Sequence, residues 1–438
     1  MSKRIYALLA SIALLSIPTV AFASDGKINS GDTAFVFLAA AMVFVMIPGL
    51  SLFYGGMARK KNALNTMMMS FILISLIGIE WILVGFSMAF GTDLGHFIGA
   101  LNFVGFTGVG SAPNSAYAGT IPFALFGLYQ MMFAIITPAL FSGAVAGRMR
   151  YPAYIAFALI WSVLVYNPLA HWVWGAGGWL KNLGVLDFAG GIVVHISAGI
   201  AALVAAFVLG ARKGYKVTSF LPHNIPLTVI GTGLLWFGWF GFNGGSALAA
   251  NGIAINAALV TNTSAAAALL SWVVVECFHR GKPTVMGALT GAVVGLAAIT
   301  PAAGYVNAGC AVIIGLIASP LSYFFVSFVK FRLGYDDALD VFGCHGVGCI
   351  WGVLATGLFA SKAVNPQGAN GLFYGNPAQL GIQAIGVVTA VAFSGVLSFV
   401  ILKALSLVLR LRENAEDESD GMDITQHGET AYPDMTND

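Results

Sequence analysis

Charged side chains are scarce in this sequence. Its 438 residues include 20 Lys and Arg and 18 Asp and Glu, 9% in all, whereas a typical soluble domain has about 25%. Hydrophobic residues make up 58% of the chain, so a soluble protein of this length could not cover its surface with charge. The composition therefore excludes a soluble enzyme, a nucleic-acid-binding protein and a disordered protein. It predicts an all-α polytopic membrane protein, and the 54 glycines suit closely packed helices.

Cysteine is also rare. The four cysteines, Cys277, Cys310, Cys344 and Cys349, lie in or beside apolar stretches and are interpreted as small buried hydrophobes. The alternative is a metal site around Cys344 and His345, but no second Cys/His pair follows at the spacing of zinc ligands. We therefore expect neither a metal nor a cofactor.

The N-terminus has the pattern of a secretory signal peptide over residues 1–23. Lys3 and Arg4 precede an apolar run, and Ala21-Phe-Ala23 is typical of a cleavage site. The alternative is an additional membrane helix, but the run Ile5–Ile17 is shorter than the roughly 20 residues needed to span a bilayer. Cleavage would leave the mature N-terminus outside.

Eleven further apolar runs follow, and turn residues separate most of them. They lie near residues 32–56, 66–90, 121–146, 152–172, 189–210, 226–246, 253–276, 285–301, 306–330, 342–360 and 381–408. The run at 285–301 is short. These runs predict a membrane domain over residues 24–412.

The basic residues predict the orientation of the spans. With the N-terminus outside, the inner connections carry fourteen Lys and Arg and the outer ones carry only three, so basic residues concentrate inside, as is usual. An odd number of spans then places the C-terminus in the cytoplasm. The inner residues are Arg59, Lys60, Lys61, Arg148, Arg150, Arg212, Lys213, Lys216, Arg280, Lys282, Lys330, Arg332, Arg410 and Arg412, and the outer ones are Lys27, Lys181 and Lys362.

The C-terminal segment, residues 413–438, differs from the rest of the chain. It contains nine acidic residues and no Lys or Arg. We interpret it as an acidic cytoplasmic tail with a regulatory role, and the alternative is a disordered, solvated segment.

Two histidines inside predicted spans have matching surroundings. His195 lies eight residues after Asp187, and His345 lies eight residues after Asp337. Because eight helical residues cover about 12 Å, both imidazoles would reach the region of the bilayer midplane from opposite sides. The pattern predicts inverted repeats formed by spans 1–5 and 6–10, with a shared site at their interface. Chance similarity is the alternative.

A midplane imidazole is costly unless it is paired or hydrated. Two neighbouring imidazoles cannot readily both be charged in a low-dielectric pore, but they could share one proton. The alternative for each is a packing histidine bonded to a carbonyl.

Several motifs, in order along the mature chain, resemble those of the ammonium transporter (Amt/Mep/Rh) family, in particular its bacterial Amt-type members. The motifs are IPGLSLFYGG (47–56), DFAGGIVVHISAG (187–199), PHNIP (222–226), GWFGFNGGS (238–246) and DVFGCHGVG (340–348). The resemblance implies eleven helices, two inverted five-helix halves plus a final helix, and a homotrimer with one pore in each protomer.

The resemblance also implies roles for individual residues, in a protein that is not an enzyme. An outer site would recruit ammonium, an aromatic gate would close it, and a pair of histidines would relay protons while ammonia is conducted, with or without the relayed proton. The implied recruitment residues are Trp174, Ser246, Tyr129 and Asp187, the gate is Phe133 and Phe242, and the pore pair is His195 and His345. Residues 421–432 resemble the tail by which bacterial members engage a PII-type signalling protein.

Two features depart from the family pattern. The segment from Trp174 to Asp187 is one residue longer than in familiar bacterial members, and Glu80 lies in the middle of the second span. We expect Glu80 to be protonated or paired at an interface, away from the pore, although a buried carboxylate in a membrane is also a functional candidate.

Two other functions share some of these features. One is an ammonium sensor of the same fold with little transport, which long additional signalling domains would favour. The other is an intramembrane metal hydrolase built on His195 and His345, for which no further ligand lies at suitable spacing. The favoured prediction is an ammonium transporter in the inner membrane of a bacterium.

Overall fold

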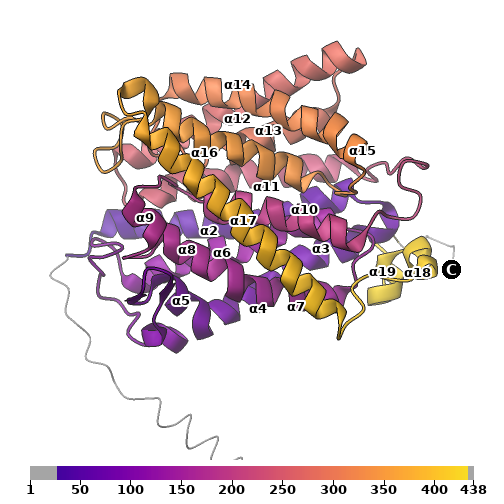
Figure 1. The fold of residues 1–438 in the computed structure, drawn as a ribbon, viewed down its shortest axis with the longest axis horizontal. Coiled ribbons are helices and arrows are strands. Elements are labelled where there is room, and N and C mark those ends of the chain that lie inside the picture. Colours follow the sequence, from indigo (N-terminus) through magenta and orange to yellow (C-terminus); the bar gives the residue numbers. More distant parts are fainter. Residues whose placement is uncertain (1–26, 433–438) are drawn as a thin grey trace, which may run out of the picture.

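The computed structural model describes residues 27–432. Long helices lie side by side in one bundle, and connecting segments gather at its two ends (Figure 1). The predicted signal peptide, residues 1–23, lies outside the described residues.

The number of spans agrees with the sequence prediction. Ten described helices are long and apolar enough to cross a membrane, and Val285–Ile299 is a shorter apolar helix, which brings the number to eleven. The ten long ones are Ser30–Met57, Lys60–Phe90, Phe123–Val145, Tyr151–Leu183, Gly191–Leu209, Ile225–Ala247, Gly252–Arg280, Ala308–Leu333, Phe342–Phe359 and Ala378–Ser406. The protein is a multi-pass membrane protein.

Many spans are composed of several shorter helical elements. In the first half these are α2 (Ser30–Met57), η1 (Lys60–Asn62), α3 (Ala63–Phe71), α4 (Leu73–Glu80), η2 (Trp81–Gly85), α5 (Phe86–Phe90), α6 (Phe123–Val145), α7 (Tyr151–Trp161), η4 (Ser162–Tyr166), α8 (Asn167–Trp174), α9 (Trp179–Leu183), η5 (Gly191–Ile196) and α10 (Ser197–Leu209). A short hairpin, β1 (Asp93–Leu94) with β2 (Ile98–Gly99), and η3 (Leu101–Phe106) connect α5 to α6.

The second half and the tail complete the bundle. The elements are α11 (Ile225–Trp239), η6 (Phe240–Gly244), η7 (Gly245–Ala247), α12 (Gly252–Arg280), α13 (Val285–Ile299), α14 (Ala308–Phe324), η8 (Phe325–Val329), α15 (Lys330–Leu333), η9 (Phe342–Val347), α16 (Gly348–Phe359), η10 (Leu372–Tyr374), α17 (Ala378–Ser406), α18 (Ala415–Asp420) and α19 (Met422–His427).

Polar residues mark the starts of several of these helices. The side chain of Asn29 accepts hydrogen bonds from the first backbone N–H groups of α2, and Asn251 and Asn307 do the same for α12 and α14. These groups have no partner within the helix, so a capping side chain stabilises the start by about 1 kcal/mol.

Two histidine-bearing spans cross in the middle of the bundle. η5 leads into α10, and η9 leads into α16. The start of each span packs against the body of the other, η9 against α10 and η5 against α16, so the two run antiparallel. This arrangement agrees with two inverted halves. α17, the last membrane-spanning helix, runs diagonally across both (Figure 1).

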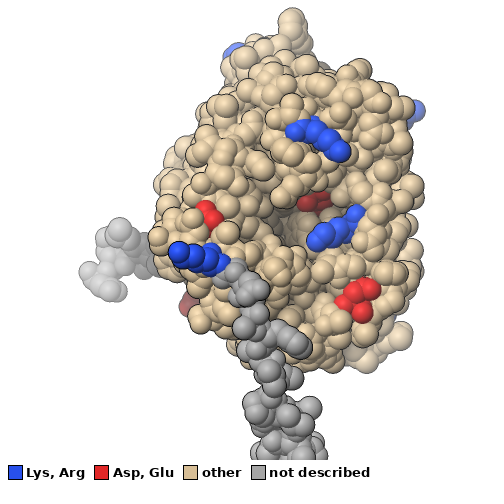
Figure 2. Space-filling view, turned by 90° about the vertical axis from the view of Figure 1, so that its left-hand side faces the viewer, with Lys and Arg blue, Asp and Glu red and all other residues tan. Residues whose placement is uncertain are grey.

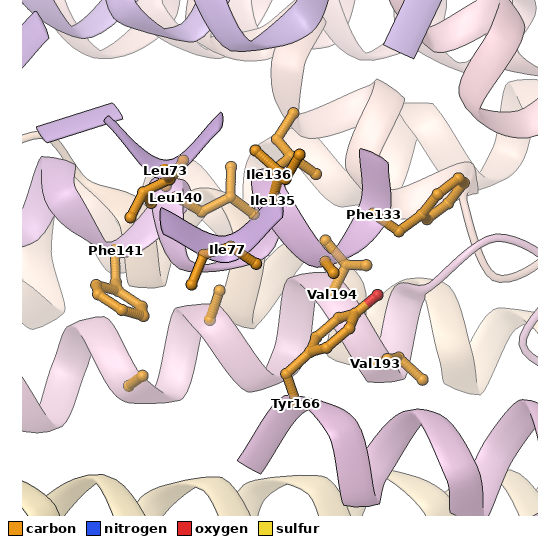
Figure 3. Close-up of a cluster of buried hydrophobic side chains, with 14 of the residues drawn as sticks. Leu73, Ile77, Phe133, Ile135, Ile136, Leu140, Phe141, Tyr166, Val193 and Val194 are labelled. Carbon is orange, nitrogen blue, oxygen red and sulfur yellow. The ribbon is translucent and has the colours of Figure 1, made fainter. Parts of the chain in front are cut away.

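One large hydrophobic core surrounds this crossing. Buried side chains of α6, such as Ile136 and Leu140, belong to the same cluster as Leu73 and Ile77 of the second span and Val194 of η5 (Figure 3). Because the core holds α6 against η5, it also positions Phe133, one turn before Ile136.

Candidate functional site

A vestibule opens at the end of the bundle that carries the β1–β2 hairpin and α9. Its volume is about 600 Å³, and Figure 2 shows this end of the molecule with a central hollow. The lining includes four of the predicted site residues: Phe133, Trp174, Asp187 and Ser246.

Hydrogen bonds hold Trp174 and Ser246 at the vestibule. Trp174, the last residue of α8, donates from Nε1 to the carbonyl oxygen of Asp187 at 2.9 Å. The Ser246 hydroxyl donates to the carbonyl oxygen of Phe242 at 2.8 Å. Both side chains therefore present fixed surfaces to the cavity, one aromatic and one hydroxyl.

Tyr129 lies behind this surface rather than on it. Its side chain is fully buried, and its hydroxyl is 3.2 Å from the Ser246 hydroxyl and 2.8 Å from the carbonyl oxygen of Phe242. Tyr129 is not among the residues that line the vestibule. Any contribution to an outer site would therefore be made through residues that it contacts, such as Ser246 and Phe133.

Two stacked phenyl rings close the floor of the vestibule. The ring centroids of Phe133 and Phe242 are 4.2 Å apart with an angle of 29° between the planes, and both side chains are buried. Trp174 meets Phe133 edge-on at 6.0 Å. An ion or molecule leaving the vestibule in this direction would first have to separate the two rings.

The two histidines lie directly behind the phenyl rings. His195 is in η5 and His345 is in η9, and their ring centroids are 5.2 Å apart with an angle of 14° between the planes. The His195 and Phe242 centroids are 5.9 Å apart. A narrow space of about 10 Å³, otherwise lined by apolar and aromatic side chains, touches both imidazoles.

The imidazole nitrogens have few partners. Neither ring nitrogen of His195, nor Nδ1 of His345, forms a hydrogen bond within residues 27–432, although all three atoms are buried. Buried polar atoms are nearly always hydrogen-bonded. The imidazole nitrogens thus face a narrow apolar space, where a small polar molecule could form hydrogen bonds with them as it passes.

Asp187 and Asp337 organise the starts of the two histidine-bearing helices. The carboxylate of Asp187 accepts four backbone hydrogen bonds, from residues 190 to 193, at 2.6–3.2 Å. Asp337 accepts one from the N–H of Phe342 at 2.7 Å. The aspartates therefore set the positions of the histidines eight residues later.

Comparison with known proteins identifies the family. A sequence model of the Ammonium Transporter Family matches residues 34–432. The chain belongs to the ammonium transporter family. It is 50% identical over 404 residues to the ammonium transporter of Bacillus subtilis (strain 168), covering 92% of this chain and 99% of that protein.

Solved structures of the family share the fold. The crystal structure of Saccharomyces cerevisiae Mep2 has a TM-score of 0.84 and 36% identity, covering 89% of this chain and 92% of that one. A structure titled "Sensor Amt Protein" has a TM-score of 0.84 and 31% identity, covering 91% of this chain and 98% of that one. Membership of a transporter family agrees with the prediction that the protein is not an enzyme.

Trp239 is a site residue of this transporter-family chain that sequence reasoning missed. Its ring stacks on His195 with centroids 5.4 Å apart, and its Nε1 donates to the Thr300 hydroxyl at 2.9 Å. Trp239 also lines the narrow space beside the histidines. Its position three residues before Phe242 was a usable signal, since both would lie on one helix face.

Glu80 lies apart from both cavities. The carboxylate accepts a hydrogen bond from the Asn167 amide at 2.8 Å and from the Ser162 hydroxyl at 3.3 Å, and the side chain is buried within the chain. Its described partners thus belong to the same chain, which does not support pairing across an interface. The expectation that Glu80 stays off the pore agrees with this position.

The described part of the acidic tail is folded against the other end of the bundle. Asp423 of α19 accepts hydrogen bonds from the N–H groups of Leu64 and Asn65 at 3.0 and 2.8 Å, and Glu418 of α18 contacts Arg412 at 2.7 Å. The alternative of a disordered, solvated segment is therefore wrong for residues 413–432. Acidic side chains that face helix starts and arginines have specific partners, which a composition argument cannot detect.

Proposed function

We propose that the protein takes up ammonium as a nitrogen source across the inner membrane of a bacterium. Ammonium is held in the vestibule and gives up its proton, and ammonia passes Phe133 and Phe242 and then His195 and His345. The observation that carries this proposal is the pair of stacked imidazoles with unpartnered nitrogens in an apolar space behind stacked phenyl rings. The proton either passes to water on the vestibule side or follows the ammonia through a relay over the two imidazoles, and a current on an ammonium jump distinguishes the two routes.

The vestibule residues suit a small cation. Cation–π contact with the Trp174 ring contributes about 0.5–2 kcal/mol, and the Ser246 hydroxyl can accept a hydrogen bond from an N–H group. Tyr129 supports Ser246 from behind, and Asp187 fixes Trp174 through its carbonyl oxygen. Such contacts hold the ion at the mouth.

Passage requires loss of charge, because moving a bare ion into a low-dielectric interior costs tens of kcal/mol by Born estimates. Ammonium can lose its charge by giving up a proton, and potassium cannot. Ammonia can then exchange hydrogen bonds with the imidazoles, which supports selectivity against potassium.

Substitution of the histidines tests the pathway. In cells without other ammonium transporters, the double variant His195→Ala, His345→Ala should lose its uptake rate or its selectivity against potassium. Trp174→Ala should raise the KM for methylammonium. An unchanged rate and selectivity in the double variant would refute the relay. A current on an ammonium jump across bilayers containing the purified protein would indicate net charge transfer; flux without current would indicate neutral transport.

The vestibule is proposed to face outwards and the tail inwards, as the basic residues predict. We also propose a homotrimer with a pore in each protomer. Large apolar side chains exposed on the spans, such as Leu259, Leu270 and Leu321, would be covered there by lipid or by a neighbouring copy. Native mass spectrometry in detergent should give the mass of three chains.

The tail supports a second proposal, binding of a PII-type signalling protein at the cytoplasmic end. Residues 421–432 carry the resemblance, and Asp423 and His427 attach this segment to α3. Deletion of residues 421–438 should abolish inhibition of uptake by added ammonium. Intact inhibition in the deletion variant would refute the role of the tail.

A sensor is the second candidate function, favoured by the similarity to the structure titled "Sensor Amt Protein". A sensor would bind ammonium in the same vestibule but show little uptake. Uptake into proteoliposomes at rates well above those of protein-free vesicles decides for the transporter.

A further inference from the structure

A lysine lies at the rim of the vestibule that is proposed to collect cations. Lys181 and Asp187 are the charged residues among its lining, and Lys181 is exposed. In Figure 2 a basic side chain projects beside the central hollow. Positive charge at the entrance of a cation pathway weakens binding, so this lysine requires an explanation.

The lysine is held in a defined place. It belongs to the short helix α9, whose first residue, Trp179, donates its N–H to the carbonyl oxygen of His96 at 3.2 Å. α9 ends at Leu183, and the next residue, Gly184, has a φ of 95°, a conformation that favours glycine. Asn182 also donates to the carbonyl oxygen of Gly177 at 2.9 Å. The charge of Lys181 is therefore anchored to a braced segment at the rim.

The ammonium group of Lys181 occupies a position that suits a free ammonium ion. Its Nζ donates to the carbonyl oxygen of Trp174 at 3.0 Å. Trp174 is the last residue of α8, and the carbonyls at a helix C-terminus carry partial negative charge that attracts cations. The lysine ammonium group thus donates a hydrogen bond to this carbonyl oxygen. The carboxylate of Asp187 accepts four backbone hydrogen bonds deeper in the site.

We propose that Lys181 determines the charge specificity of the vestibule: its tethered ammonium group lowers the affinity for monovalent ammonium moderately and for divalent cations strongly. This proposal rests on the recruitment of ammonium proposed above. Coulomb repulsion scales with the charge of the ligand, so Lys181 raises the binding free energy of a divalent cation by twice as much as that of ammonium. The factor by which it weakens divalent binding is therefore the square of the factor for ammonium. Mg²⁺ and Ca²⁺ are thus kept out while ammonium is admitted.

Neutral and charged substitutions separate this role from a structural one. In proteoliposomes at an ionic strength of about 10 mM, Lys181→Gln should lower the KM for methylammonium about threefold with Vmax unchanged, and should lower the Mg²⁺ concentration for half-inhibition about tenfold. Lys181→Met gives a second neutral variant, and Lys181→Arg keeps the charge and should behave as wild type. At about 1 M salt the variants should converge, because the screening length is then about 3 Å.

The outcomes are distinct. An unchanged KM and Mg²⁺ response in both neutral variants, with a raised KM in Trp174→Ala, would overturn the role of Lys181 and leave the recruitment site standing. A raised KM in the neutral variants would also overturn it, since Lys181 would then support Trp174 rather than oppose cations. An unchanged KM in Trp174→Ala as well would refute the recruitment site itself.

Discussion

The two histidine-bearing helices begin in the same way along the sequence but have different surroundings. At the vestibule end, the carboxylate of Asp187 is satisfied by four backbone N–H groups. At the opposite end, the carboxylate of Asp337 accepts a hydrogen bond from the N–H of Phe342 at 2.7 Å, and its carbonyl oxygen accepts one from Lys330 at 2.8 Å. Lys330 also pairs with Asp340.

The difference shows how two inverted repeats with the same backbone can present different polar groups at the two ends of the pathway. The cap at the vestibule end is made of peptide N–H groups, and among the described residues no basic side chain pairs with Asp187. The other end carries fixed basic side chains, with Arg148 and Arg212 around Asp336 as well as Lys330. The two ends therefore differ in how their carboxylates are satisfied, by peptide N–H groups at one and by ion pairs at the other, although the backbone plan is repeated.

Loss of the charge at each aspartate should affect the two ends unequally. In Asp187→Asn an NH2 group replaces one carboxylate oxygen, so up to two of the four buried N–H groups lose their acceptor and face another donor. Each unsatisfied group costs about 1–3 kcal/mol. We expect methylammonium uptake, corrected for the amount of protein in the membrane, to fall about tenfold or more.

Asp337→Asn is the matched control. The remaining amide oxygen can still accept from Phe342, so uptake should stay within about twofold of wild type. Equal losses in the two variants would show that the two ends are not electrostatically different.

The ion pairs around Asp336 should make the stability of the protein fall as the pH is lowered into the acid range. Burial opposes ionisation of Asp336, but the hydrogen bonds and charge of Arg212 outweigh burial and lower the pKa of Asp336 from its usual 3.8 to about 2. Because the folded-state pKa is the lower one, the stabilisation is fully present above pH 4 and is lost as pH falls towards 2. It amounts to about 2 kcal/mol.

Asp336→Asn would leave Arg148 and Arg212 without their carboxylate, and breaking a buried pair costs about 3–5 kcal/mol. Its temperature of half-maximal aggregation, measured by size-exclusion chromatography of heated detergent samples, should be lower than that of wild type at pH 7 by several degrees. Between pH 4 and pH 2 the difference should shrink. A constant difference over this range would rule out the ionised pair as its source.

The smallest effect is expected at Glu80, which belongs to neither end. In Glu80→Gln the amide oxygen can accept from the amide of Asn167 and the NH2 group can donate to the hydroxyl oxygen of Ser162, so uptake should change by no more than about twofold. The measurement is again uptake corrected for protein in the membrane. A loss as large as that expected for Asp187→Asn would mean that this carboxylate takes part in transport.

Much of the framework was accessible from the sequence because it is local or periodic. Eleven apolar runs predicted the spans, and the eight-residue spacing from Asp187 and from Asp337 predicted two histidines arriving from opposite sides. The short run at 285–301 was correctly counted, and α13 is indeed shorter than the other spans.

The remaining features depend on contacts between distant segments. The stacking of Trp239 on His195 joins two spans, so the spacing of Trp239 from Phe242 could indicate a shared helix face but not the contact with His195. The acidic tail could not be distinguished from a solvated one, because its partners, such as the start of α3, are more than 350 residues away. The position of Tyr129 behind Ser246 likewise depends on how α6 packs against η6 and η7.

Several pathway residues share one backbone feature. Phe242, His195 and His345 lie in the π-helical turns η6, η5 and η9, and the N–H of His195 bonds to the carbonyl of Gly190, five residues back. A π turn holds one residue more than an α-helix needs, as a single-residue insertion would. Removing one residue from η5 would turn its two sides by about 100° relative to each other, carrying the imidazole away from its partner. An in-frame loss of a single codon in one of these turns is thus enough to break the pathway while the rest of the fold is retained.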